Sequence, residues 1–173
     1  FEDVLLAGLA RDGGLYLPQT WPSFSETELK RMRGMSYADL AIAVLSAFIG
    51  GEIKPTDFAR MVRESYATFR HDAVCPLIQT STNEFSLELF HGPTLAFKDV
   101  AMQLVARLMD HVLAERDQRA TVVCATSGDT GSAAIEAFAA GSDLDWAEQV
   151  VVVASPASHR QLAAAPGLRH QLH

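Results

Sequence analysis

Residues 85–109 read FSLELFHGPTLAFKDVAMQLVARLM, and within this stretch the pattern of a strand changes into the pattern of a helix. The first few residues alternate apolar and polar side chains, which is the period of a β-strand. Gly92 and Pro93 follow, a pair typical of turns. From Val100 onward the apolar residues recur at helical spacing. The stretch therefore predicts a strand, a turn and a long helix.

Lys98 lies where this turn enters the helix. The positive end of the helix macrodipole disfavours a cation there, and burial beside Leu95 and Phe97 would disfavour the ammonium form further. A neutral amine can form a Schiff base with a carbonyl compound. On these local residues alone, the favoured interpretation is a lysine that extends into solvent from a helix start.

The residues after this helix continue an alternation of strands and helices. Short β-branched runs at 121–125 and 149–154 predict buried strands, and residues 132–140 between them predict a helix. Such an alternation predicts parallel pairing, here with the strand at 85–89 included. We therefore expect an α/β domain over residues 71–173, with an open parallel sheet and flanking helices.

Residues 1–70 predict a separate helical region. Ser25 and Glu28 have the spacing of a capping box, and Ser36 is a good N-cap for a second helix. Gly50 is suited to end that helix, and Pro55 is suited to the first turn of a third.

A second turn, at 126–131, combines glycines with hydroxyl side chains after a predicted strand and before a predicted helix. In open α/β sheets, ligands bind beyond the carboxyl ends of the strands. The free N–H groups of a helix start favour an anion such as a carboxylate or phosphate. The residues alone also fit a plain helix cap made by Ser127 or Asp129.

Composition restricts the classes of partner and site. The formal net charge is −7, which argues against nucleic acid or an anionic membrane as the main partner, although a local site can still bind a phosphorylated substrate. Cys75 and Cys124 show no metal-ligand spacing and are more typical of small buried residues than of reactive thiols. We expect no metal site and a cytoplasmic location.

Three stretches together resemble the threonine synthase family. They are GLARDGGLYLP at 8–18, ELFHGPTLAFKD at 88–99 and ATSGDTGSAA at 125–134. The family consists of enzymes that use pyridoxal 5'-phosphate (PLP) and have the tryptophan-synthase-β fold type, also called fold type II. The resemblance implies that Lys98 is the catalytic lysine and binds PLP as a Schiff base, and that the chain is the N-terminal portion of such an enzyme.

The resemblance also implies roles for the residues around Lys98. Ser127, Gly128 and Asp129 would bind the cofactor, with Asp129 where related enzymes often have asparagine. Substrate contacts would come from His91, Thr94, Ser127 and Thr130. For His91 a purely structural role is an equal alternative. For Asp99 a helix cap is the favoured role over that of a catalytic base.

The family's reaction converts O-phospho-L-homoserine and water into L-threonine and phosphate, with Lys98 as the natural proton carrier. The family's Gly-Asn-Phe phosphate loop does not occur in these 173 residues, so we expect this chain alone to be inactive. Another fold-type II PLP lyase or dehydratase, or a non-catalytic threonine-synthase-like paralogue, remains an alternative. The sequence does not indicate the oligomeric state.

Overall fold

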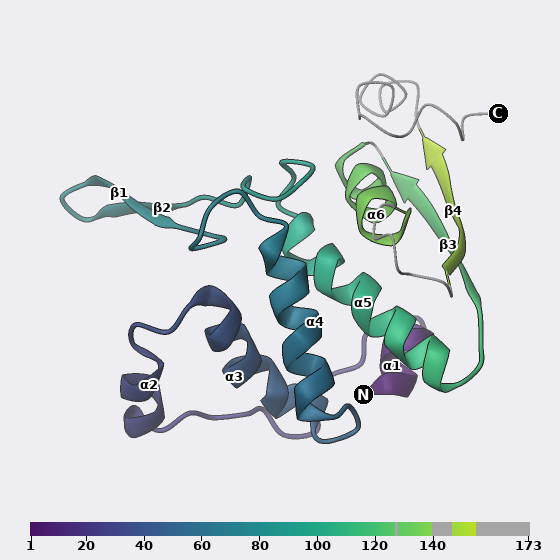
Figure 1. Ribbon diagram of the computed structural model, residues 1–173, viewed down its shortest axis with the longest axis horizontal. Coiled ribbons are helices and arrows are strands. Elements are labelled where there is room, and N and C mark those ends of the chain that lie inside the picture. The colour runs from purple at the N-terminus through teal and green to yellow at the C-terminus, as the bar shows by residue number, and fades with distance from the viewer. Residues whose placement is uncertain (127, 140–146, 155–173) are drawn as a thin grey trace. The chain divides into compact units, whose positions relative to one another are not determined.

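The chain forms two compact units, Phe1–Ala67 and Thr68–His173 (Figure 1). The structure is a computed structural model, which describes residues 1–126, 128–139 and 147–154.

The first unit is helical, as its sequence predicts. Ser25 and Glu28 form the expected capping box, in which the Glu28 carboxylate accepts the Ser25 N–H at 2.7 Å and the Ser25 hydroxyl oxygen accepts the Glu28 N–H at 3.3 Å. Ser36 caps the next helix, which ends at Gly50, and Pro55 begins the one after it. The helices are α1 (Glu2–Ala7), α2 (Glu26–Met32), α3 (Tyr37–Ile49) and α4 (Pro55–Ala67).

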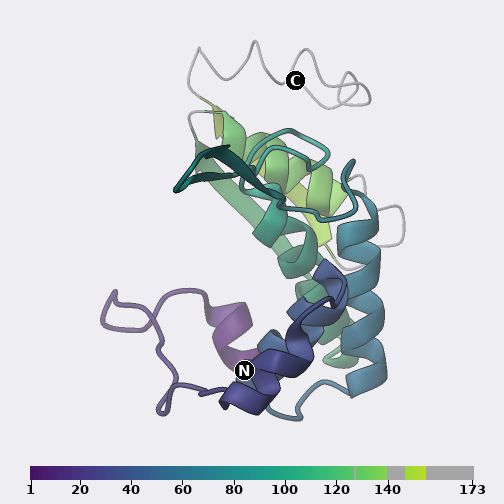
Figure 2. The same cartoon turned by 90° about the vertical axis from the view of Figure 1, so that its left-hand side faces the viewer.

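Helices α3 and α4 run side by side and share an apolar core (Figure 2). Tyr37 of α3 meets Tyr66 of α4 edge to face, with ring centroids 4.8 Å apart. Met61 and Val62 of α4 are almost fully buried, together with Ile49, Ile53 and Phe58. Burial of these side chains is the main source of stability in this unit.

Two carboxylates at helix starts in this unit have pKa values below their ordinary range. A hydrogen bond from the Ser25 hydroxyl is the main cause for the pKa of Glu28. A hydrogen bond from the Ser36 hydroxyl is the main cause for the pKa of Asp39, followed by one from Arg63, whose Nη2 lies 2.8 Å from Asp39 Oδ1. Each interaction favours the charged form of the acid.

The second unit begins with an antiparallel hairpin of β1 (Leu77–Ser81) and β2 (Glu84–Leu87). The alternating pattern correctly predicts a strand at β2, but the expectation that this strand joins the parallel sheet is wrong. Alternation shows that a strand has two different faces and does not identify its partner. Here a two-residue turn at Thr82 and Asn83 brings the chain directly back, so the nearest segment becomes the partner.

The parallel sheet is made by β3 (Ala120–Thr126) and β4 (Ala147–Ala154), in the register that places Val122 beside Val150. Helix α5 (Asp99–Glu115) precedes β3, and α6 (Asp129–Ala139) lies between the two strands in sequence (Figure 1). The predicted parallel pairing of these two strands and the long helix after Lys98 are both confirmed.

Helices α5 and α6 pack together through small side chains. Ala106 of α5 and Ala134 and Ala137 of α6 are buried with Phe138 in one cluster, and small residues allow the helix backbones to approach. Cys124 of β3 packs against this cluster, and burial raises the pKa of its thiol. Burial therefore favours the neutral thiol, as expected for a packing residue.

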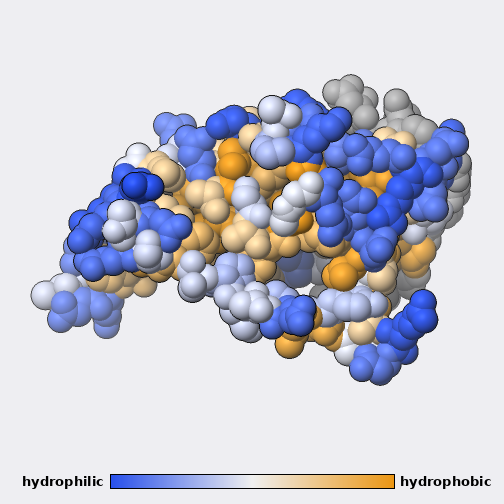
Figure 3. All heavy atoms as spheres, turned by 90° about the horizontal axis from the view of Figure 1, so that it is seen from below, coloured by the Kyte–Doolittle hydropathy of each residue, from blue (hydrophilic) through white to orange (hydrophobic). Residues whose placement is uncertain are grey.

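Apolar side chains also reach the surface of both units (Figure 3). Within residues 8–24 of the first unit, Leu15 and Leu17 are about three-quarters exposed, and Trp21 is also largely exposed. Among the residues described, no helix combines the length and apolar character that crossing a membrane would need.

Candidate functional site

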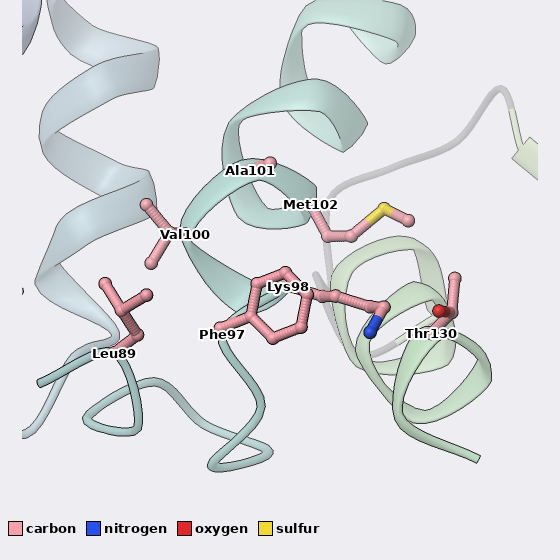
Figure 4. A pocket seen from close by; sticks show the side chains of 7 residues that line it. All are labelled: Leu89, Phe97, Lys98, Val100, Ala101, Met102 and Thr130. Atoms are coloured by element: carbon pink, nitrogen blue, oxygen red, sulfur yellow. The ribbon is translucent and has the colours of Figure 1, made fainter. Parts of the chain in front are cut away.

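Lys98 lies immediately before the first residue of α5 and reaches into a hollow of about 480 Å³ (Figure 4). Its Nζ lies 4.1 Å from the centroid of the Phe97 ring, a cation–π distance. The hollow is lined by Leu89, Phe97, Lys98, Val100, Ala101, Met102 and Thr130. Its walls are thus mainly apolar, and they carry one primary amine and one hydroxyl group.

Thr130 brings the second predicted turn to this hollow. It lies in the first turn of α6 and lines the same hollow as Lys98 (Figure 4). The structure therefore brings together Lys98, at the N-cap of α5, and Thr130, in α6, which are 32 positions apart in sequence.

The turn between β3 and α6 is held by two hydroxyl groups. The Thr126 oxygen accepts the N–H groups of Gly128 at 3.0 Å and Gly131 at 3.2 Å, and the Ser132 hydroxyl donates to the Gly128 carbonyl at 3.2 Å. The cap expected from Ser127 or Asp129 is thus supplied at least in part by Thr126. Thr126 and Ser132 support the turn, whereas Thr130 presents its hydroxyl to the hollow.

The other predicted residues of this turn are placed differently. Gly128 is buried and has φ 149°, a conformation that favours glycine. Asp129 is exposed and is the first residue of α6. Ser127 lies outside the described residues.

The turn before Lys98 is held by Asp99, which is fully buried. One carboxylate oxygen, Oδ2, accepts the Thr94 N–H at 2.8 Å, and the other, Oδ1, accepts the Thr94 hydroxyl at 2.7 Å. Lys98 is the N-cap of α5, and its side chain makes no capping hydrogen bond. The structure therefore does not support the favoured reading of Asp99 as a helix cap, because its carboxylate binds the preceding loop.

His91 is held by its neighbours. Its Nε2 lies 2.7 Å from Glu88 Oε2, and its ring centroid lies 5.0 Å from that of His71. Its carbonyl oxygen accepts the Arg70 N–H at 2.9 Å. In the part of the chain that the structure describes, neither His91 nor Thr94 lines the hollow around Lys98. Their roles as substrate contacts stay predictions.

Two residues that support the site were not predicted from the sequence: Met102, which lines the hollow, and Thr126, which holds the turn. Thr126 ends β3, and a hydroxyl at the end of a strand suits an acceptor for the N–H groups of the next helix. Met102 follows Lys98 by four positions, which places it on the same face of α5. That spacing was a usable signal for a wall of the site.

A model of the threonine synthase N terminus matches residues 1–66. The threonine synthase of Pseudomonas aeruginosa is 57% identical over 136 residues, which is 79% of this chain and 29% of that protein. The threonine synthase of Saccharomyces cerevisiae is 44% identical over 149 residues, which is 78% of this chain and 29% of that protein. The chain thus spans about 30% of the length of these curated relatives.

Two solved structures of threonine synthases are also similar to this chain. The PLP-bound threonine synthase of Brucella melitensis has 62% sequence identity and a TM-score of 0.84, over 93% of this chain and 35% of that one. The yeast threonine synthase has 37% identity and a TM-score of 0.83, over 95% of this chain and 35% of that one.

Proposed function

We propose, on the premise that this chain matches the N-terminal third of threonine synthases, that it supplies the cofactor lysine of a PLP-dependent enzyme. The full-length protein would be a lyase that converts O-phospho-L-homoserine and water into L-threonine and phosphate. The observation that carries this proposal is the amine of Lys98, which lies in an apolar-walled hollow opposite the Thr130 hydroxyl (Figure 4).

The residues around Lys98 fit the aldehyde and ring of PLP. A primary amine can bond to the aldehyde carbon, and the side chains of Phe97 and Met102 offer apolar surface to an aromatic ring. Gly128 has no side chain to block a ligand at the start of α6. Lys98 would hold the cofactor, with Gly128, Asp129 and Ser127 as further contacts. When bound, PLP supplies an electron sink that stabilises negative charge on substrate carbons.

The chain's own groups account for the remaining tasks at this end of the site. The Lys98 amine would move protons at substrate carbons. The Thr130 hydroxyl and the amino end of α6 suit the substrate carboxylate, because a helix start favours an anion.

Three other substrate contacts are proposed: Ser127, which lies outside the described residues, and Thr94 and His91, which already bind other groups. Thr94 already uses its N–H and its hydroxyl hydrogen on Asp99, so only its oxygen lone pairs are left for a substrate. His91 uses Nε2 on Glu88. Thr130 therefore has the strongest structural support among the proposed substrate contacts.

The test is phosphate release from O-phospho-L-homoserine by the full-length protein. We expect turnover in the unmodified protein, none in Lys98→Ala, and none in Lys98→Arg, because a guanidinium does not form the bond to the aldehyde. Lys54→Ala is the matched control and should keep full activity. Phosphate release by Lys98→Ala at the unmodified rate would overturn the proposal. Ammonia release from threonine, without phosphate release, would instead indicate a dehydratase.

A further inference from the structure

The Asp99 carboxylate is a fully buried charge that, among the described residues, does not line the hollow beside it. A buried carboxylate is strongly destabilising unless hydrogen bonds satisfy it. Asp99 receives two charge-assisted hydrogen bonds, at 2.8 and 2.7 Å, and both come from Thr94. The positive end of the α5 macrodipole favours the charge further, since Asp99 is the first residue of that helix.

These two bonds close a loop that contains Lys98. The loop runs from Thr94 to Asp99 and includes Leu95, whose φ is 65°. A non-glycine residue in the left-handed region is strained, so its surroundings must hold it there. The Leu95 N–H donates to the Gly92 carbonyl at 3.2 Å. The contact between Thr94 and Asp99 holds the two ends of the loop that contains Leu95. Such strained residues are typical of functional sites.

Gly92 provides the space in which the Asp99 carboxylate lies. A Cβ atom on Gly92 would lie 2.8 Å from Asp99 Cγ and would also overlap Asp99 Cβ and Oδ2. Real Cβ atoms do not make contacts this close, so Asp99 can occupy its position only against a glycine. Gly92, Thr94 and Asp99 therefore specify one arrangement of the loop.

We propose that Asp99 and Thr94 form a positioning pair, which fixes the backbone at Lys98 so that Nζ faces Thr130. This inference rests on the proposed function, because it assigns a purpose to the direction of the Lys98 amine. Among the described residues, neither member of the pair lines the hollow, so we infer that the pair acts through Lys98. Asp99 is not a proposed substrate contact, so the Asp99→Asn variant separates positioning from any substrate contact made by Thr94. Loosening the pair should therefore lower kcat and leave KM nearly unchanged, since the walls that bind ligand stay in place.

The experiment compares four variants of the full-length protein: Asp99→Asn, Thr94→Val, Thr94→Ser and Thr80→Val. Asp99→Asn keeps only one accepting oxygen, Thr94→Val loses the hydroxyl at nearly equal volume, and Thr94→Ser keeps both bonds. Thr80→Val is the matched control, because Thr80 donates its hydroxyl to the Glu84 carbonyl, at 3.3 Å, in the hairpin.

A misplacement of about 1 Å can reduce a rate by about 100-fold, so we expect kcat to fall about 10- to 100-fold in Asp99→Asn and Thr94→Val. KM should stay within about threefold of the unmodified protein's value, because the substitutions would impair turnover and not substrate binding. Thr94→Ser should restore kcat, and Thr80→Val should match the unmodified protein. Hydrogen exchange of the 93–98 peptide without cofactor should become faster in Asp99→Asn, because the neutral amide oxygen accepts the Thr94 N–H more weakly than a carboxylate does.

Unchanged kcat in both Asp99→Asn and Thr94→Val would overturn the positioning role, as would a fall in kcat that only follows the folded fraction. Exchange as slow as in the unmodified protein in both Asp99→Asn and Thr94→Val would overturn the contact itself. If Asp99→Asn does not fold, the comparison of Thr94→Val with Thr94→Ser decides. An unmodified protein without turnover would overturn the proposed function and the positioning role with it, whereas normal turnover with unaffected variants overturns only the latter.

Discussion

Gly92→Ala is the substitution whose effect follows most directly from the structure. The new methyl carbon would lie 2.8 Å from Asp99 Cγ, so the Asp99 side chain must move. Movement weakens the two hydrogen bonds from Thr94, which are worth about 1.5–3 kcal/mol each because the acceptor is charged. Part of this loss is recovered by relaxation, and overpacking itself typically costs about 1–3 kcal/mol. We therefore expect the loop around Lys98 to be destabilised by about 2–4 kcal/mol.

Native-state hydrogen exchange measures this change locally and does not require the whole protein to unfold in one step. A loss of 2–4 kcal/mol corresponds to exchange about 30- to 1,000-fold faster in the 93–98 peptide. Gly51→Ala is the control, because no atom lies within 4 Å of a Cβ placed there. Its effect should stay within about 1 kcal/mol. Equal exchange in the Gly92→Ala variant and the unmodified protein would refute the reasoning.

Three further predictions concern the packing and polar contacts. Met61→Ala should destabilise the first unit by about 2–5 kcal/mol in thermal unfolding, because Met61 is almost fully buried; a loss below about 1 kcal/mol would contradict that core. The pKa of Asp39 lies below its ordinary value of 3.8, so its contribution to stability is present above pH 3.8 and is lost as the pH falls through the lower pKa of the folded state. Ser36→Ala should remove most of this acid dependence in melting curves recorded between about pH 5 and pH 2, and an unchanged dependence would contradict the assignment. Thr126→Val removes the acceptor of two N–H groups, so the free energy of local opening at the start of α6 should fall by about 1–2 kcal/mol and hydrogen exchange there should become faster. Unchanged protection there would show that the hydroxyl does not hold the turn.

Local sequence signals predicted the helices well. The capping box at Ser25 and Glu28, the cap at Ser36 and the first-turn Pro55 all act within one or two helical turns, so a single sequence contains the information. The four valines from Val150 to Val153 likewise predict a strand from their own chemistry.

The partner of a strand or side chain was harder to predict than the presence of the element itself. The strand at Glu84–Leu87 was expected in the parallel sheet, whereas it pairs with Leu77–Ser81 through a tight turn. The Asp99 carboxylate was expected at its own helix end, whereas it binds Thr94. In both cases the sequence indicates that a strand or a side chain needs a partner, but the identity of that partner depends on the path of the folded backbone.

Both turns were expected beyond the ends of parallel strands, and Lys98 and Thr130 do line one hollow. The strand before Lys98 belongs to the hairpin and not to the parallel sheet, so that rule does not explain why the two residues meet. The separate tasks of the hydroxyls could not be predicted, because Thr126, Thr130 and Ser132 are chemically alike. Their directions depend on the backbone of the turn.

The central claim is that Lys98, and no other lysine of this chain, bonds to the cofactor. The direct test is to add PLP to the full-length protein, reduce with borohydride and locate the modified residue by peptide mass spectrometry. The account predicts the pyridoxyl group on Lys98 and none on Lys30 or Lys54, the chain's other two lysines. Modification of either of those residues while Lys98 stays unmodified would contradict it.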